Sequence, residues 1–163
     1  MLDRDPSSST VLTSGPAPGR DRFEAVTPSG WSRLLTRRGL VLYISDDPES
    51  RILITRMARR WQTVKLLLSE TGRGGLRLAL VRRPDVIVLD DRLPDAPGAD
   101  VLGQLGSLLT TASTPVVVIG STTTPEHRAS FLGSGAAHYL TKPLHIAELE
   151  RTVGTLLELA AMR

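Results

Sequence analysis

Short runs of apolar residues, separated by segments of helical length, are the feature that most limits what this chain can fold into. The runs are LVLYIS, TVKLLL, DVIVLD and TPVVVIG, followed by the shorter HYLT. The first four lack polar and apolar alternation, so we expect strands buried on both faces of a parallel sheet. Between and after the runs, apolar residues recur at helical spacing, as in residues 53–61 and 146–157. Strand and helix repeated five times predict an α/β, doubly wound (βα)5 domain.

Composition divides the chain near residue 38. The first thirty residues are rich in Ser, Thr, Pro and Gly and have too few apolar side chains to offset the entropy of ordering. We therefore expect residues 1–38 to be a disordered tail or linker, with a short amphipathic helix at Trp31, Leu34 and Leu35 as an alternative. Residues 39–160 would form the domain, and residues 161–163 its end, with no output domain.

Several classes of function are disfavoured by composition. The chain contains no cysteine, which removes disulfides and thiolate chemistry. It shows no signal peptide and no apolar stretch of membrane-spanning length, so we expect a cytoplasmic protein. The net charge is +3, but the basic residues are scattered, which favours solvated helix surfaces over nucleic-acid binding. The three histidines are also dispersed and are expected at surface or cap positions rather than at a metal.

Pairs of aspartates follow two of the apolar runs. Asp46 and Asp47 come after the first run, and Asp90 and Asp91 come at the end of the third. In an open parallel sheet, ligands bind outside the carboxyl ends of the strands, and a strand order of 2-1-3-4-5 makes these two ends neighbours. Facing carboxylates raise one another's pKa unless a cation joins them, and oxygen ligands without His or Cys suit Mg²⁺. The sequence therefore predicts a divalent cation at this edge.

The local sequence assigns a different task to each acid. Asp47 opens DPES, which is typical of a helix start with Asp at the N-cap, and this leaves Asp46 as the metal ligand. Asp90 directly ends its apolar run and should point into the crevice, with Asp91 beside it. Lys142 ends the fifth run and reaches the same edge. Two acids, a metal and one ammonium group make a site that can carry an added phosphoryl group.

These segments resemble the receiver domain of two-component response regulators. LVLYISDDP is similar to the first strand and acidic loop of that family, PDVIVLDDRLPDAPG to its phosphoacceptor strand and loop, and GAAHYLTKP to its lysine segment. The resemblance covers about residues 39–160. It implies a flavodoxin-like receiver fold with a five-stranded parallel sheet in the order 2-1-3-4-5.

The resemblance also implies a role for each matching residue at the site. Asp90 would accept a phosphoryl group from the phosphohistidine of a sensor histidine kinase or phosphotransfer protein. Lys142 would pair with the bound phosphoryl group. Asp46, Asp90 and the main-chain carbonyl of Arg92 would hold Mg²⁺. Transfer would then depend mainly on positioning and on neutralisation of charge.

Two positions depart from the family pattern. Where the family has an acid, this chain has Ser45, which removes one negative charge from the metal site and leaves Asp47 to compensate in part. Where the family has a Ser or Thr that binds the phosphoryl oxygen, this chain has Gly120, and Ser121 should point to the other side of the strand. We expect an intact acceptor with weakened Mg²⁺ binding and a weakened signal relay.

The same resemblance implies how a signal would leave the domain. Tyr139 would be the switch residue that turns inward on activation, and the peptide bond between Lys142 and Pro143 would be cis. Output would pass through a downstream protein partner, or through a homodimer, at the face formed by the fourth helix, fifth strand and fifth helix.

Two functions remain open from the sequence. One is a phosphorylatable single-domain receiver, and the other is a degenerate receiver that acts as a phosphorylation-independent interaction module. An enzyme is disfavoured, because a haloacid dehalogenase needs a second acid where Arg92 stands. The GRGG of residues 72–75 is too short for a phosphate-binding loop, and we expect it to form the turn between the second strand and its helix.

Overall fold

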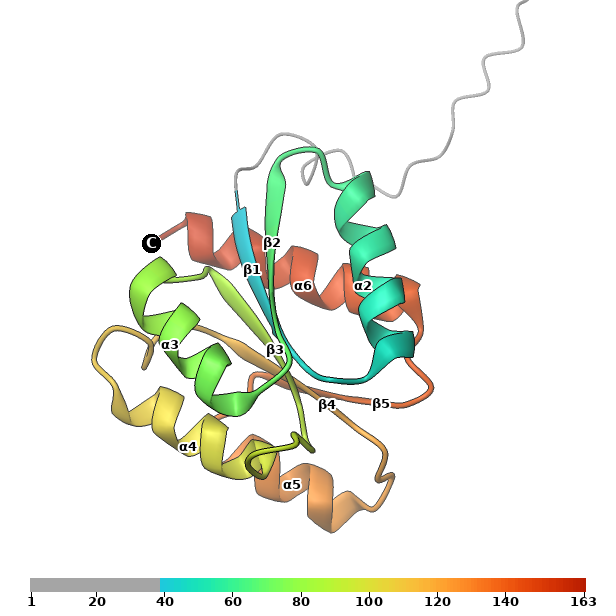
Figure 1. Cartoon of the computed structure of the whole chain (residues 1–163), viewed down its shortest axis with the longest axis vertical. Coiled ribbons are helices and arrows are strands. Elements are labelled where there is room, and N and C mark those ends of the chain that lie inside the picture. The colour runs from blue at the N-terminus through green and yellow to red at the C-terminus, as the bar shows by residue number, and fades with distance from the viewer. Residues whose placement is uncertain (1–38) are drawn as a thin grey trace, which may run out of the picture.

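The computed structural model describes residues 39–163, and the predicted N-terminal tail and the helix predicted at Trp31 lie outside them. Strands and helices alternate strictly along these residues (Figure 1). The elements are β1 (Gly39–Ile44), α2 (Pro48–Arg60), β2 (Val64–Ser69), α3 (Gly72–Arg82), β3 (Val86–Asp90), α4 (Gly98–Ser107), β4 (Val116–Gly120), α5 (Pro125–Gly133), β5 (His138–Thr141) and α6 (Ile146–Ala161). Within residues 39–163, no helix has the length and apolar character needed to cross a membrane.

The five strands form one parallel sheet in the order β2-β1-β3-β4-β5, which confirms the predicted topology. Strand β1 pairs with β2 on one side and with β3 on the other, so Leu42 is in register with both Leu67 and Ile87. Because all the strands run the same way, their carboxyl ends share one edge. That edge carries the last residues of β3 and β4, which are Asp90 and Gly120.

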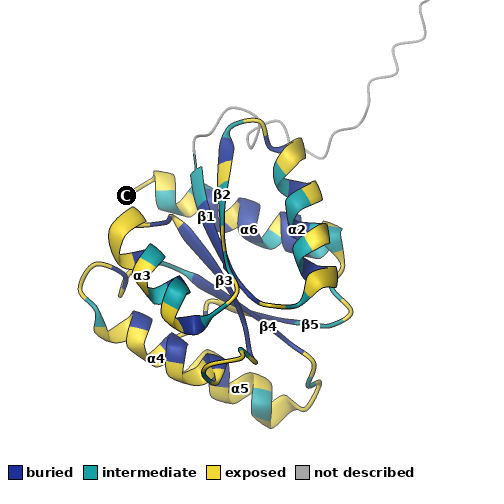
Figure 2. Ribbon diagram, in the orientation of Figure 1, coloured by how far each residue is buried: buried dark blue, intermediate teal, exposed yellow. Residues whose placement is uncertain are grey.

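Helices cover both faces of the sheet and enclose two apolar cores. Figure 2 shows the central strands buried and the helices exposed along their outer sides. On one face, α2 and α6 contribute side chains such as Met57 and Val153. On the other face, α3, α4 and α5 contribute side chains such as Ala79, Leu105 and Phe131. Strands β3 and β4 are buried along their whole length, which explains why their sequences carry no polar alternation.

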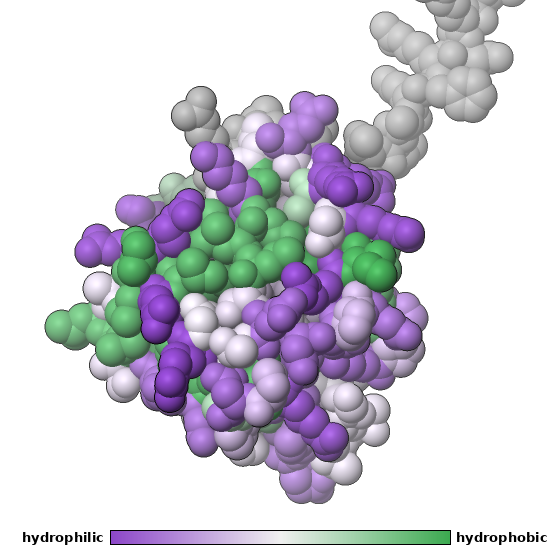
Figure 3. Space-filling view, viewed as in Figure 1, coloured by the Kyte–Doolittle hydropathy of each residue, from purple (hydrophilic) through white to green (hydrophobic). Residues whose placement is uncertain are grey.

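Strand β2 differs from the prediction of a strand buried on both faces. Lys65 and Leu68 are exposed, and Leu66 and Leu67 are only half-buried. The reason is topological, because β2 is an edge strand and has a neighbouring strand on one side only. The space-filling view accordingly shows an apolar area where β2 lies between α2 and α3 (Figure 3).

The prediction for GRGG was wrong, because α3 already begins at Gly72 and these residues form its first turn. The N–H groups at a helix start need outside acceptors. Here the carboxylate of Asp95 accepts from Gly72 and Arg73, and Thr71 Oγ1 accepts from Gly74. Glycine has a low helix propensity, but here the glycines allow other parts of the chain to pack closely against the helix.

Gly75 shows how close that packing is. A Cβ atom at Gly75 would lie only 2.4 Å from Cδ1 of the buried Ile44 in β1. We predict that Gly75→Ala destabilises the fold by about 1 to 3 kcal/mol through overpacking. The measurement is the midpoint of urea unfolding. Gly103→Ala is the matched control, because a Cβ atom at Gly103 in α4 meets nothing within 4 Å.

We expect that control to gain about 0.5 to 1 kcal/mol from reduced backbone entropy in the unfolded chain. Equal unfolding midpoints for the two variants would contradict the packing that places α3 against β1.

Candidate functional site

Asp90 occupies the centre of the edge where the strands end. It is the last residue of β3 and is only 2 % exposed. Its Oδ2 atom accepts hydrogen bonds from Ser45 Oγ and from Lys142 Nζ, each at 2.8 Å, and its Oδ1 atom accepts from the backbone N–H of Arg92 at 3.2 Å. Both oxygens of this buried carboxylate are therefore satisfied by groups that stabilise negative charge.

The ammonium group of Lys142 lies between two carboxylates. Its Nζ atom is 2.8 Å from Asp90 Oδ2 and 3.2 Å from Asp47 Oδ2. Burial alone would lower the pKa of Lys142, but the hydrogen bonds and charges of Asp90 and Asp47 outweigh burial and raise it. Lys142 reaches this edge from β5, so one side chain links the ends of β3 and β5 to the start of α2.

Asp47 caps α2, as its sequence predicted, and also takes part in the site. Its Oδ1 atom accepts from the backbone N–H of Glu49, and its Oδ2 atom accepts from Ser50 Oγ at 2.5 Å. Burial acts to raise the pKa of Asp47, but hydrogen bonds from Ser50 and Lys142 and the lysine charge bring it below its ordinary value. Asp47 is therefore an ionised partner of Lys142 as well as a helix cap.

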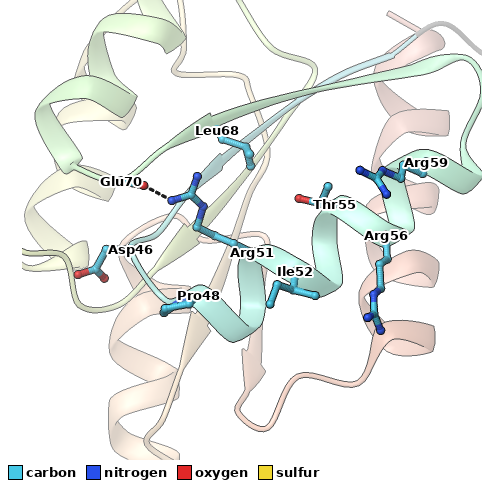
Figure 4. A pocket seen from close by; sticks show the side chains of 9 residues that line it. All are labelled: Asp46, Pro48, Arg51, Ile52, Thr55, Arg56, Arg59, Leu68 and Glu70. Carbon is cyan, nitrogen blue, oxygen red and sulfur yellow. Dashed lines mark hydrogen bonds and ion pairs between the residues drawn. The ribbon is translucent and has the colours of Figure 1, made fainter.

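The sequence predicted that Asp46 faces Asp90, and Asp46 lies just beyond β1, at the same edge of the sheet as Asp90. Asp46 is exposed and lies at the end of a groove of about 590 Å³ between α2 and the edge strand β2 (Figure 4). Arg51, which also lines this groove, forms an ion pair with Glu70. The second carboxylate beside Lys142 belongs to Asp47. The metal role of Asp46 thus remains a prediction.

The donor set at this edge still suits Mg²⁺ in its chemistry. Within residues 39–163, no group of three or more His, Cys, Asp or Glu side chains is arranged to hold a metal ion. Magnesium, however, commonly uses one or two carboxylates and completes its shell with water. Asp46, Asp90 and the exposed residue Arg92, through its carbonyl, offer oxygen donors only. These residues fit a weakly held, largely hydrated cation.

A second polar cluster lies on the other side of Asp90. Asp91 is buried, and its Oδ2 atom is 3.4 Å from His127 Nε2, whereas its Oδ1 atom makes no hydrogen bond within residues 39–163. Burial and the charge of Asp90 raise the pKa of Asp91, and His127 offsets part of this effect. Tyr139 is buried beside this cluster, and burial together with the Asp91 charge raises the pKa of its hydroxyl.

The remaining predicted residues lie as follows. Ser45 is buried in the site and bonded to Asp90, Gly120 ends β4, and Ser121 is exposed just beyond it. The peptide bond between Lys142 and Pro143 is cis, as predicted.

Two residues of the site were not predicted from the sequence. Ser50 donates to Asp47, and the position of Ser50 one turn after a helix-capping Asp was an available signal. His127 was expected at a surface or cap position, and it does lie partly exposed in the first turn of α5, but its contacts with Asp91 and two aromatic rings were not predicted. The signal for His127 was its place in the first turn of the helix that follows β4.

A parallel sheet in the order 2-1-3-4-5, with a buried carboxylate and a lysine at its carboxyl edge, defines a doubly wound α/β domain of the flavodoxin-like class. Comparison with known families agrees, because the model of the response regulator receiver domain matches residues 41–154. The chain belongs to the response regulator receiver domain family.

Individual relatives agree with this assignment. The chain is 40 % identical over 112 residues to transcriptional regulatory protein KdpE of Mycobacterium tuberculosis, with 67 % of this chain and 46 % of that protein covered. It is 32 % identical over 110 residues to KDP operon transcriptional regulatory protein KdpE of Escherichia coli, with 68 % and 47 % covered. The chain thus spans about half the length of these curated relatives.

Solved structures show the same fold. The receiver domain of Francisella response regulator 1452 matches with a TM-score of 0.67 and 28 % sequence identity, covering 74 % of this chain and 98 % of that chain.

The two tasks of Asp47 can be separated by substitution. Asn is as good an N-cap as Asp, so Asp47→Asn keeps the cap but loses the charge beside Lys142 and the oxygen that accepts from Ser50, whereas Asp47→Ala loses all three. We predict a cost in unfolding free energy of about 1 kcal/mol for the lost cap and less for the lost charge. Urea unfolding at neutral pH measures both costs.

The dependence on pH gives a second check on the charge. The pKa of Asp47 is lower in the folded chain than its ordinary value of 3.8, so its charge stabilises the fold above that value and the benefit is lost as the pH falls through the folded pKa. The stability difference between wild type and Asp47→Asn should therefore shrink below about pH 4. A difference that is constant with pH would show that Asp47 acts only as a cap.

Proposed function

We propose that this chain works as a phosphoacceptor receiver domain in which Asp90 takes a phosphoryl group from the phosphohistidine of a sensor histidine kinase or phosphotransfer protein. One observation carries the proposal. The carboxylate of Asp90 is buried where β3 ends and is held 2.8 Å from the ammonium group of Lys142. This pair supplies a nucleophile and a positive charge at one point of an edge where ligands of such sheets bind.

The proposed phosphoryl transfer from phosphohistidine to Asp90 needs no further reactant. An oxygen of the Asp90 carboxylate attacks phosphorus in line, the new P–O bond forms as the P–N bond breaks, and the histidine ring leaves with the electron pair of that bond. Negative charge on the phosphoryl oxygens is then neutralised by Lys142, whose pKa is raised by its neighbours so that it stays protonated. Such reactions depend on positioning and electrostatic stabilisation more than on proton transfer.

Magnesium belongs to the same proposal. Asp46, Asp90 and the main-chain carbonyl of Arg92 would hold the ion, which when bound supplies further neutralisation of the phosphoryl oxygens. Ser45 contributes a hydroxyl rather than a charge, and its hydrogen bond to Asp90 occupies one carboxylate oxygen. With Lys142 already shared between two carboxylates, we expect Mg²⁺ to bind weakly.

A second candidate function is an interaction module whose output does not depend on phosphorylation. The observation that favours it is Gly120, which ends β4 without a hydroxyl to bind a phosphoryl oxygen. In either case the face formed by α5, β5 and α6 would contact a downstream protein or a second copy of the chain. Because the relatives are named transcriptional regulatory proteins, we extend the proposal to a pathway that controls transcription.

Phosphorylation of Asp90 is directly testable. Incubation with acetyl phosphate and Mg²⁺ should add the mass of one phosphoryl group to the intact protein, and Asp90→Asn should abolish the gain while the circular dichroism spectrum is retained. Asp91→Asn is the matched control, since this neighbour faces His127 and not Lys142. Labelling that persists in Asp90→Asn would place the acceptor elsewhere. A wild-type protein that is never labelled would favour the second function.

The metal site makes a separate prediction. Ser45→Asp restores an acidic residue beside Asp90, so Mg²⁺ should bind roughly tenfold more tightly, which corresponds to about 1.4 kcal/mol. Isothermal titration calorimetry measures the affinity. Ser107→Asp adds the same charge at the far end of α4 and should leave the affinity unchanged. Unchanged or weaker binding in Ser45→Asp would show that Asp47 already supplies the charge.

A further inference from the structure

The space beside Gly120 is filled by the side chain of Tyr139. A Cβ atom at Gly120 would lie 1.9 Å from the Tyr139 hydroxyl oxygen and 2.6 Å from its Cζ atom. It would also lie 2.6 Å from Asp91 Oδ2. Real Cβ contacts do not occur at such distances, so this position of Tyr139 requires glycine at residue 120. The ring is only 2 % exposed and thus lies inward.

Polar contacts hold the Tyr139 hydroxyl in this position. The hydroxyl donates a hydrogen bond of 3.3 Å to the carbonyl of Thr122, in the loop that follows β4. The buried Asp91 carboxylate lies against the same place, because both groups approach the point where a Gly120 side chain would be. A buried hydroxyl with a partner is costly to move, since leaving the partner unpaired costs free energy.

Helix α5 depends on this ring for its position. Phe131 is the only residue of α5 that is buried. The rings of Phe131 and His127 lie 5.6 Å and 5.9 Å from the ring of Tyr139, and 5.1 Å from each other. These separations are those of favourable aromatic pairs. Moving Tyr139 would therefore remove ring contacts that help to hold the helix in place.

We propose that the missing side chain at Gly120 leaves a permanent space for the Tyr139 ring, which we call the socket. The inward ring and the face formed by α5, β5 and α6 then keep one conformation whether or not Asp90 is phosphorylated. The space for the Tyr139 ring comes from the missing side chain at Gly120 and not from a displaced loop. No phosphoryl group is therefore needed to create this space. A ligand shifts a conformational equilibrium only by its difference in affinity for the two states. The statement about phosphorylation rests on the proposed function, whereas the position of Tyr139 does not.

This account gives a different cause for the weak relay that the sequence predicted. The sequence argument was that Gly120 lacks a hydroxyl for the phosphoryl oxygen. The structure adds that the position vacated by that side chain is already occupied. It follows that Gly120→Thr should do more than supply a hydroxyl, because the new side chain and the inward Tyr139 cannot coexist.

The chain allows Tyr139 to be observed alone. It contains only two tyrosines. Tyr43 and Tyr139 belong to different apolar cores, so Tyr43→Phe removes the other signal with a close match in shape and without touching the packing around Tyr139. In this background, NMR of a ring-labelled Tyr139 with a soluble paramagnetic agent reports solvent access. The spectra are recorded with and without Mg²⁺ and beryllofluoride.

We expect the ring to be protected from the agent at the start and to stay equally protected after beryllofluoride is added. Gly120→Ala and Gly120→Thr should abolish the protection, while Gly133→Ala, whose Cβ meets nothing within 4 Å, should leave it intact. A ring that is exposed at first, or that becomes protected only with beryllofluoride, would overturn the proposal. This comparison needs no Gly120 variant and stays valid if those variants do not fold.

Failure of the proposed function is detected separately. The intact mass of the same background protein after acetyl phosphate shows whether Asp90 is an acceptor, and that result does not alter Tyr139 protection. A thermodynamic cycle adds an independent check, because Gly120→Ala should destabilise the chain more when Tyr139 is present than in a Tyr139→Ala background, where only the contact with Asp91 Oδ2 remains. Equal costs of Gly120→Ala in the two backgrounds would contradict the socket.

Discussion

One ammonium group held between two carboxylates joins three parts of this domain that are remote in sequence. Lys142 follows β5, Asp90 ends β3, and Asp47 starts α2, so the ion pairs cross the sheet edge from its outermost strand toward its middle. Because Asp90 is buried, loss of the lysine would leave an uncompensated charge in a poorly solvated place. The chemistry proposed for Asp90 and the geometry of the edge therefore rest on the same contact.

Ser45 and Gly120, which the sequence analysis expected to depart from the family pattern, are accommodated in different ways. Ser45 is smaller than an acid but joins the network directly, since its hydroxyl donates to Asp90 and accepts from the N–H of Asp47. Gly120 contributes no side chain, and the volume is taken by Tyr139 from the neighbouring strand. A hydroxyl thus contacts Asp90 at one strand end, and an aromatic ring fills the space beside a glycine at another.

Much of this fold follows from local sequence, and the limits of that prediction have physical causes. Apolar runs located all five strands, and the resemblance supplied their order. Strand β2 was expected to be buried because Leu66, Leu67 and Leu68 resemble a central strand, yet burial depends on the neighbours that the topology provides. Asp90 and Lys142 were placed at one edge because parallel strands end together. The pairing of Lys142 with Asp47, and the packing of Tyr139 against Gly120, depend on side-chain directions across strands that spacing does not encode.

The contact between Asp95 and α3 has a consequence for the loop that joins β3 to α4. This loop contains Arg92 and supplies the acceptors for the first two N–H groups of α3 through the single carboxylate of Asp95. Its length is therefore matched to the position of a helix from another part of the chain. An insertion or deletion between Asp91 and Gly98 would displace Asp95 and leave those donors unpaired, although surface loops usually accept such changes. The segment that follows Asp90 is thus as constrained in length as a core element.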